Sequence, residues 1–420
     1  MFGKILNTFF SKTLAALFNF LTIILTAQYL GAEGKGITSL IVVNISIIIL
    51  VNDIVGGPSF VYLAPREKTL RLITPAYIWA AISAAITGFI LSFFSGFPTY
   101  INLHVAFLGF LQSLVSVNIA ILSGKEQIKE ANAAFLSRAG IILGTLLLAF
   151  VLLDHIKVMS FVYAWYGGTI LSFLLSMLYL KPFLITTSLQ GIQRLLRTVF
   201  RYGAIIQTGN ILQFLNYRIS YYLLSYLIGN AQVGIYSIAI AIAEAVLLIA
   251  KSFSYVQYAR ISNLNNQESA KKLTYLLMPA SFWITLIGLG ILGSLPGPLF
   301  QWVFGPEFKG INHLLWLLSP GILAMGINTI LSHYFSGHGK FYINAIGSGI
   351  GFILTLTACY VLIPIYGTQG AAISASIAYA STMIFTLTMF KMETNFSWNI
   401  FLLKKNDIEI LKEQFKSLRK

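Results

Sequence analysis

The feature that most limits the fold of this chain is a series of apolar runs, each long enough to cross a lipid bilayer. A transmembrane helix needs about 20 mostly apolar residues. By this criterion we predict twelve helices, over residues 13–31, 37–60, 72–95, 101–123, 132–153, 159–180, 203–228, 234–258, 273–296, 312–335, 341–363 and 369–390. Short apolar runs also occur in soluble cores, but so many in succession exclude that interpretation. The chain is therefore predicted to be an all-α polytopic membrane protein.

The composition agrees with this prediction and removes one class of partner. Hydrophobic residues make up 57% of the chain and charged residues 10%, whereas a soluble domain carries roughly 25% charged residues. The formal net charge of +15 would suggest nucleic acid in a soluble protein, but these charges fall between the apolar runs. We therefore expect no nucleic-acid partner. The single cysteine, Cys359, lies within an apolar run and excludes an intrachain disulfide bond.

The lysines and arginines alternate between the two sides of the predicted helices. One set of connections holds only Lys35, Lys157 and Lys309. The other set, which includes both termini, holds Lys4, Lys12, Arg66, Lys68, Arg71, Lys125, Lys129, Lys181, Arg194, Arg197, Arg201, Arg260, Lys271, Lys272, Lys340 and a basic tail. Because cytoplasmic connections carry the excess of Lys and Arg, both termini are predicted to lie in the cytoplasm.

Two connections repeat each other almost half a chain apart. "QYLGAEGKGITSL" and "YLIGNAQVGIYSI" each lie between two apolar runs, and Gly31 and Gly36 of the first correspond to Gly229 and Gly234 of the second. A second pair, "LSGKEQIKEANAAF" and "FSGHGKFYINAIGS", follows the fourth and the tenth predicted helix. The chain is thus predicted to form two six-helix lobes related as parallel repeats. This arrangement is typical of alternating-access transporters, whose substrate site lies between the repeats.

Four segments follow from this interpretation. They are an N-lobe of helices 1–6 (1–180), a cytoplasmic linker (181–202), a C-lobe of helices 7–12 (203–390) and a cytoplasmic tail (391–420). The linker carries apolar residues on one side and arginines elsewhere, which predicts an amphipathic segment whose arginines meet anionic membrane lipids. The tail is also amphipathic, and its thirty residues are too few for an independent core.

Two charged residues lie at the centre of predicted helices. Arg218 precedes Gly229 on helix 7 and Glu244 follows Gly234 on helix 8 by similar distances, so both lie roughly 15–16 Å from the same outer turn. A centred arginine costs about 2.5–3.5 kcal/mol on insertion scales and therefore faces a partner or a wet cavity. We expect Arg218 and Glu244 to be partners.

Polar residues share helical faces with this pair and define a candidate substrate-binding cavity. At 100° per residue one face of helix 7 and one sector of helix 8 are polar, and helix 1 has a similar stripe. The candidate cavity residues are Arg218, Glu244, Lys251, Gln207, Asn210, Tyr221, Asn19 and Tyr255. Such residues suit a diphosphate and sugars, and the alternative is that they only make hydrogen bonds between helices.

The remaining polar positions carry weaker signals. Arg138, about two turns into helix 5, either snorkels to the inner surface or contacts a headgroup at the inner mouth of the cavity. Asp53, beside "GGPSF", is expected at a helix end near the inner surface, with ion coupling as the alternative. The histidines show no metal-ligand spacing. We expect no metal and no cofactor.

Three stretches resemble the polysaccharide transporter family of lipid-linked oligosaccharide flippases, in the multidrug/oligosaccharidyl-lipid/polysaccharide exporter superfamily. They are "YLGAEGKGITSL", "RYGAIIQTGNILQFLNYRISYYLLSYLIGNAQVGIYSIA" and "FGPEFKGINHLLWLLSPGILAMGINTILSHYFSGHGK". The chain departs from the pattern at Ser220, where many relatives have Asp. The resemblance implies a flippase of the bacterial cytoplasmic (inner) membrane. Its cargo would be undecaprenyl-diphosphate-linked repeat units for O-antigen, capsule or exopolysaccharide, and polymerase or assembly proteins would be its partners.

Two other functions were compared with this one. A cation-coupled small-molecule exporter of the multidrug and toxin extrusion type shares the two-lobe architecture, but a cationic drug site favours several buried carboxylates. A membrane enzyme, such as a polysaccharide polymerase or ligase, needs an active-site surface outside the membrane. The outer connections here are short and nearly uncharged, so we expect the chain not to be an enzyme.

Overall fold

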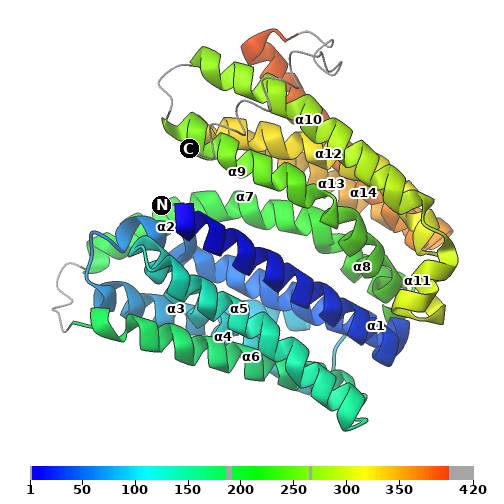
Figure 1. Cartoon of the computed structure of the whole chain (residues 1–420), viewed down its shortest axis with the longest axis horizontal. Coiled ribbons are helices and arrows are strands. Elements are labelled where there is room, and N and C mark those ends of the chain that lie inside the picture. The colour runs from blue at the N-terminus through cyan, green and yellow to red at the C-terminus, as the bar shows by residue number, and fades with distance from the viewer. Residues whose placement is uncertain (1, 186–191, 264–266, 397–420) are drawn as a thin grey trace. The chain divides into compact units, whose positions relative to one another are not determined.

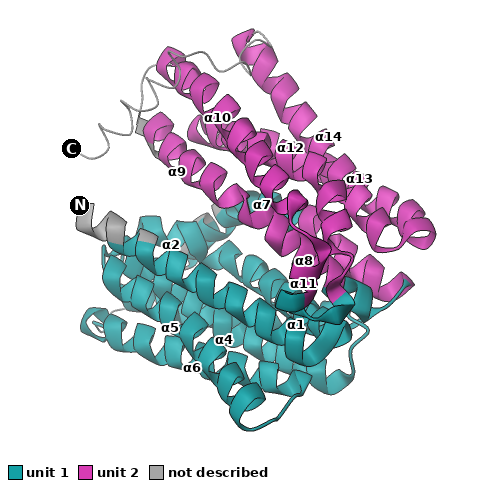
Figure 2. Ribbon diagram, turned by 45° about the vertical axis from the view of Figure 1, so that its right-hand side comes forward, with its two compact units in different colours: residues 1–214, 228–234, 302–307 teal, residues 215–227, 235–301, 308–420 magenta. Residues whose placement is uncertain are grey.

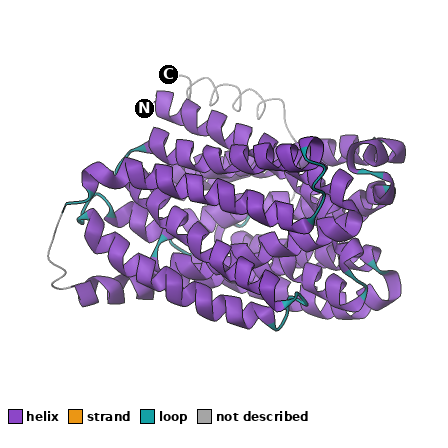
Figure 3. Ribbon diagram, turned by 90° about the horizontal axis from the view of Figure 1, so that it is seen from below, coloured by secondary structure: helices purple, strands orange, loops and turns teal. Residues whose placement is uncertain are grey.

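A computed structural model describes residues 2–185, 192–263 and 267–396, and these residues form helices and loops with no strand (Figure 3). Figure 1 labels the helices in chain order. The first half contains α1 (Phe2–Asn52), η1 (Asp53–Val55), α2 (Gly57–Leu63), α3 (Thr69–Ser92), α4 (Thr99–Gly124), α5 (Ile128–Leu147), η2 (Leu148–Leu152), α6 (Val158–Leu180) and η3 (Lys181–Phe183). The second contains α7 (Ile192–Leu227), α8 (Asn230–Ala245), α9 (Leu247–Asn263), α10 (Gln267–Ser294), α11 (Gly297–Phe304), η4 (Pro306–Phe308), α12 (Ile311–Gly337), α13 (Phe341–Tyr366) and α14 (Thr368–Thr394).

The prediction of an all-α polytopic membrane fold is confirmed. Within the described residues, nine helical segments are long and apolar enough to cross a membrane, and a bent pair formed by α8 and α9 raises the number to ten. One segment, Phe10–Leu63, covers two of the predicted helices. The other predicted helix, α7, fails the same test because glutamines, asparagines and Arg218 interrupt its apolar sequence. Each of the twelve predicted spans therefore has a helical counterpart.

The chain divides into two compact units (Figure 2). Unit 1 comprises residues 1–214, 228–234 and 302–307, and unit 2 comprises 215–227, 235–301 and 308–420. Helix α7 thus contributes to both. The predicted lobe boundaries and the cytoplasmic position of the termini stay predictions. Residues 186–191 of the predicted linker and 397–420 of the predicted tail lie outside the described residues, whereas residues 192–202 are the first turns of α7.

Unit 1 is held together by small and polar residues as well as by apolar ones. Apolar contact gives little driving force between helices when the solvent is itself apolar, so interhelical hydrogen bonds gain in importance. In unit 1 the Tyr77 hydroxyl donates to Asn118 Oδ1 at 2.6 Å, and Asn118 Nδ2 donates to Ser176 Oγ at 2.9 Å. These two bonds join α3, α4 and α6. In unit 2, α10, α12 and α14 share an aromatic core that includes Tyr334 and Phe390.

The two repeated glycine connections pack against each other within unit 1. Gly31 (φ 66°) and Gly229 (φ 130°) both have positive φ, which favours glycine. A Cβ on Gly36 would overlap the carbonyl oxygen of Asn230, and one on Gly234 would overlap that of Ala32. The repeat therefore has a physical reason: the first glycine of each copy turns the chain, and the second lets the backbones touch. Because Gly31 has non-helical backbone angles, α1 consists of two helices that meet at this residue.

The outward side of α3 shows how the chain meets its apolar solvent. Large apolar side chains recur every three or four residues and are exposed at Ile78, Ile82, Ile86, Phe89 and Phe93. Residues at this spacing lie on one helix face. A contiguous apolar stripe of this kind suits lipid chains and would be an aggregation liability in water.

Candidate functional site

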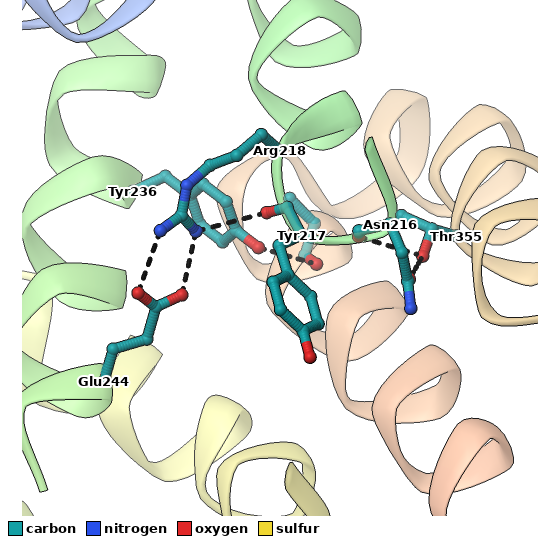
Figure 4. A network of polar contacts seen from close by, with 7 residues as sticks. Asn216, Tyr217, Arg218, Tyr236, Glu244 and Thr355 are labelled. Carbon is teal, nitrogen blue, oxygen red and sulfur yellow. Dashed lines mark hydrogen bonds and ion pairs between the residues drawn. The ribbon is translucent and has the colours of Figure 1, made fainter. Parts of the chain in front are cut away.

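The candidate site is centred on the predicted pair of charges in unit 2. Arg218 of α7 donates from Nη1 to Glu244 Oε1 and from Nη2 to Glu244 Oε2 of α8, both at 2.8 Å (Figure 4). This parallel, two-bond geometry is the strongest that a guanidinium and a carboxylate can form. The side chains are 21% and 17% exposed. The predicted partnership of Arg218 and Glu244 is confirmed.

Aromatic side chains surround the guanidinium and fix its position. Its carbon lies 5.6 Å from the centre of the Tyr221 ring, and Nη1 also donates to the backbone oxygen of Tyr217 at 3.3 Å. The Tyr221 ring contacts Tyr236 edge to face at 5.7 Å. The Tyr236 hydroxyl in turn donates to the carbonyl oxygen of Ala371 on α14 at 3.4 Å. Arg218 therefore has contacts besides the one with Glu244.

Lys251 supplies a second positive charge near the pair. It lies on α9, after a 50° bend that separates α8 from α9. Its charge acts on the Glu244 carboxylate. The sequence predicted one continuous helix over residues 234–258, so the bend is a departure from that prediction. A Cβ on Gly288 of α10 would lie 2.6 Å from Val246 at the bend, which shows that Val246 packs directly against the glycine.

A polar network that was not predicted from the sequence is centred on Asn216, the residue before Tyr217. Thr355 Oγ1 of α13 donates to Asn216 Oδ1 at 2.6 Å, and Asn216 Nδ2 donates to Thr382 Oγ1 of α14 at 3.5 Å. A Cβ on Gly351 would overlap the Asn216 amide. Gly351, the last residue of the sequence GSGIG (347–351) in α13, therefore allows close helix packing. The network anchors α7 to α13 and α14 directly beside Arg218 (Figure 4).

Gln207 and Asn210 lie in the part of α7 that belongs to unit 1. Gln207 is buried, and its Nε2 donates to the backbone oxygen of Asp53 at 3.5 Å. The exposed Asn210 donates from Nδ2 to Gln207 Oε1 at 2.8 Å. Gln207 thus makes the interhelical hydrogen bond that was the alternative to a substrate contact. The place of both residues in a cavity with Arg218 stays a prediction.

The other candidate residues have surroundings of their own, and their place in a cavity stays a prediction. Asn19 is exposed on α1. Tyr255 of α9 is exposed and contacts the His333 ring edge to face at 5.6 Å. The guanidinium carbon of Arg138 lies 5.8 Å from the Phe135 ring and 5.7 Å from the Trp165 ring. Arg138 is thus held by aromatic contacts, and its proposed headgroup role stays a prediction.

Asp53 lies at a helix end, as expected. α1 ends at Asn52, and the chain passes through η1 and Gly56 before α2 begins at Gly57. Asp53 Oδ1 accepts hydrogen bonds from Ser116 Oγ at 3.2 Å and from Asn52 Nδ2 at 3.5 Å. Among the described residues, no three His, Cys, Asp or Glu side chains form a group that could hold a metal ion.

Comparison with solved structures identifies the fold. The lipid II flippase MurJ, in an inward closed conformation, matches with a TM-score of 0.76 at 15% identity, over 99% of this chain and 93% of that one. An inward-facing multidrug resistance MATE family transporter of the MOP superfamily matches with a TM-score of 0.71 at 16% identity, over 90% and 94%. The Vibrio cholerae MATE transporter VcmN matches with a TM-score of 0.63 at 12% identity, over 96% and 98%.

No family model and no curated protein sequence matches the chain. The chain therefore has the fold that MurJ and the MATE transporters share. The superfamily resemblance inferred from its sequence is confirmed as a resemblance of fold.

Proposed function

We propose that this chain, which has the fold of membrane flippases and exporters, moves a diphosphate-linked oligosaccharide lipid across the bilayer. Its cargo would be an undecaprenyl-diphosphate-linked repeat unit, carried from the inner to the outer leaflet for surface polysaccharide assembly. The chain would lie in the bacterial cytoplasmic membrane with both termini inside, and polymerase or assembly proteins would receive its product. The fold supports transport of this general kind, and the sequence motifs support the cargo class.

The observation that carries this proposal is the two-bond pair of Arg218 and Glu244. A diphosphate brings several negative charges into a medium of low dielectric constant, where each cation counts strongly. A guanidinium can grip phosphate through the same parallel hydrogen bonds that it now makes to Glu244. Glu244 would neutralise Arg218 while the site is empty and yield it to the cargo. Lys251, beyond the bend, would guide the headgroup toward the pair.

The alternative function is a small-molecule exporter, because MATE transporters share the fold. A cationic drug needs a carboxylate that is free to pair with it. Glu244 is already paired with Arg218, and Asp53 accepts hydrogen bonds from Ser116 and Asn52. The arrangement of charge at the pair therefore favours an anionic cargo over a cationic one.

The test measures lipid-linked oligosaccharide in the outer leaflet of a strain that lacks the native gene for this protein and expresses a variant instead. Arg218→Ala and Arg218→Lys should both abolish surface glycan when compared with wild type at matched protein levels, because neither a methyl nor an ammonium group can form the two-bond grip. Lys251→Ala should only reduce it. Arg66→Ala is the matched control, since this exposed arginine stacks on Tyr62 outside the pair.

Two results would contradict the proposal. Full glycan delivery by well-expressed Arg218→Ala would make Arg218 a structural residue only. Wild-type protein that restores ethidium efflux but no glycan would instead support the exporter.

A further inference from the structure

A groove on unit 1 lies outside the candidate transport site and has no role in the proposed cargo transfer. It measures about 540 Å³. Val55 of η1 together with Ile78 and Ile82 of α3 form an apolar wall, and Phe200 of α7 faces them. Two arginines of α7 complete the lining. An apolar groove with cations in its lining has the chemistry of a lipid site.

The apolar wall is open to the lipid phase. Ile78 is 58% exposed, Ile82 46% and Phe200 45%. The two isoleucines belong to the exposed apolar stripe of α3. Because lipid chains are as apolar as leucine, such a wall accepts an acyl chain but does not distinguish one lipid from another. Any selectivity must come from the polar end of the groove.

The polar end consists of Arg197 and Arg201, one helical turn apart on α7. Residues at this spacing have Cβ atoms about 5–6 Å apart, so both guanidinium groups can reach one phosphate. Both arginines are exposed, and within the described part of the chain neither pairs with a carboxylate. Two residues later, a Cβ on Gly203 would overlap the carbonyl oxygen of Ile54, which follows the end of α1.

The apolar wall of the groove follows α3 away from the two arginines. Ile82 lies two turns beyond Pro75, which also lines the groove, so the wall extends about 10 Å along α3. The helix pair that frames it is fixed. Trp79 contacts Phe200 edge to face at 5.5 Å, and Trp79 Nε1 donates to the backbone oxygen of Asn52 at 3.1 Å. The walls are therefore preformed and do not depend on the ligand.

We propose that this groove binds one anionic phospholipid, with its phosphate at Arg197 and Arg201 and an acyl chain along Ile78 and Ile82. The charge of the lining selects the occupant, because two cations without a paired carboxylate favour an anion. The lining also explains why the occupant is a phospholipid and not the oligosaccharide cargo. Apart from the two arginines, its side chains offer almost no hydrogen-bonding groups for sugars.

The experiment measures lipid retention by the purified full-length chain, using native mass spectrometry with dioleoyl phosphatidylglycerol and dioleoyl phosphatidylethanolamine as probes. Wild-type protein should retain one phosphatidylglycerol in clear preference to phosphatidylethanolamine. Arg197→Gln and Arg201→Gln should each reduce that preference roughly fivefold, the value of one basic residue near an anionic surface. The double variant Lys271→Gln/Lys272→Gln on α10 removes as much charge as Arg197→Gln/Arg201→Gln, but outside the groove, and should leave the preference unchanged.

A second variant separates the groove from general surface charge. Ile78→Trp/Ile82→Trp fills the apolar wall and leaves both arginines in place, so it should lower retention of phosphatidylglycerol. Three results would overturn the proposal: equal preference in wild type and Arg197→Gln/Arg201→Gln, unchanged retention after the groove is filled, or displacement of phosphatidylglycerol by stoichiometric undecaprenyl diphosphate. The last would assign the groove to the cargo. Since no transport is measured, failure of the proposed function would not affect these outcomes.

Discussion

Arg218 and Glu244 neutralise each other through two hydrogen bonds of 2.8 Å that run from α7 to α8. Each is the other's charge partner, and Lys251 adds a further positive charge near the carboxylate. Removal of the arginine therefore leaves the Glu244 carboxylate with less positive charge nearby, whereas removal of both charges leaves no unpaired carboxylate. Stability and transport should respond differently to these changes, which makes the two roles separable.

The first prediction concerns that pair. Arg218→Ala should destabilise the protein, but by less than the about 3–5 kcal/mol that breaking a fully buried ion pair can cost, because the pair is partly exposed. Glu244→Gln in the Arg218→Ala background should restore much of the loss, because the orphaned charge is removed. The measurement is thermal unfolding of the four proteins of a double-mutant cycle. Strictly additive shifts in Tm would mean that the two side chains do not interact.

The second prediction concerns the contact between the repeated glycine connections. Gly36→Ala and Gly234→Ala should each lower Tm, because the added methyl group meets a backbone carbonyl that no rotamer change can move. Overpacking of this kind costs about 1–3 kcal/mol. Gly290→Ala and Gly349→Ala are matched controls, since a Cβ at either position has no neighbouring atom within 4 Å. The controls should be neutral or slightly stabilising, because alanine favours helices over glycine.

The third prediction tests the network of Asn216. Thr355→Val removes the donor to Asn216 Oδ1 and keeps the shape of the side chain. This variant should have a lower Tm than wild type, because interhelical hydrogen bonds of membrane proteins contribute about 0.6 kcal/mol on average and up to about 1.7 kcal/mol. Thr357→Val is the control, since its hydroxyl donates to carbonyls of its own helix and its side chain is exposed. Equal Tm values for the two variants would show that the contact with Asn216 adds no stability.

The fourth prediction concerns orientation in the membrane. Single cysteines at Glu33 and Lys309 should react with an impermeant thiol reagent in intact cells, whereas one at Arg197 should react only after permeabilisation. All three positions are exposed in the structure. The native Cys359 is fully buried and should give little background. Labelling of Arg197→Cys from outside, with intact membranes, would reverse the predicted topology.

Sequence alone could predict the helices and the charge pair, for physical reasons that are local. A membrane span can be recognised in a sequence by its length and its lack of charge. Arg218 and Glu244 stand out because a charge at membrane depth needs a partner, and their equal distance from one turn identified that partner. The start of α7 was harder to predict from the sequence, since its arginines are typical both of a surface linker and of a helix that begins before the membrane.

The features that sequence could not predict depend on contacts between distant residues. The bend between α8 and α9 has neither proline nor glycine at Val246, and it coincides with the fit of that side chain against Gly288. Thr355 carried no signal, because a threonine in an apolar helix can satisfy its hydroxyl on its own backbone. Its pairing with Asn216 became visible only once α7 and α13 were placed together.

The contact of the two glycine connections has the form of a self-complementary interface. Gly36 packs against the carbonyl of Asn230, and Gly234 packs against the carbonyl of Ala32. Each copy of the motif therefore supplies both a glycine and the backbone that the other glycine contacts. Surfaces related by a twofold axis show this reciprocity in homodimers. Here the two partners are joined by the polypeptide and are free to diverge in sequence. Their contact nevertheless ties them: an insertion or a larger residue in one copy must be accommodated by the other, so the two connections can change only together.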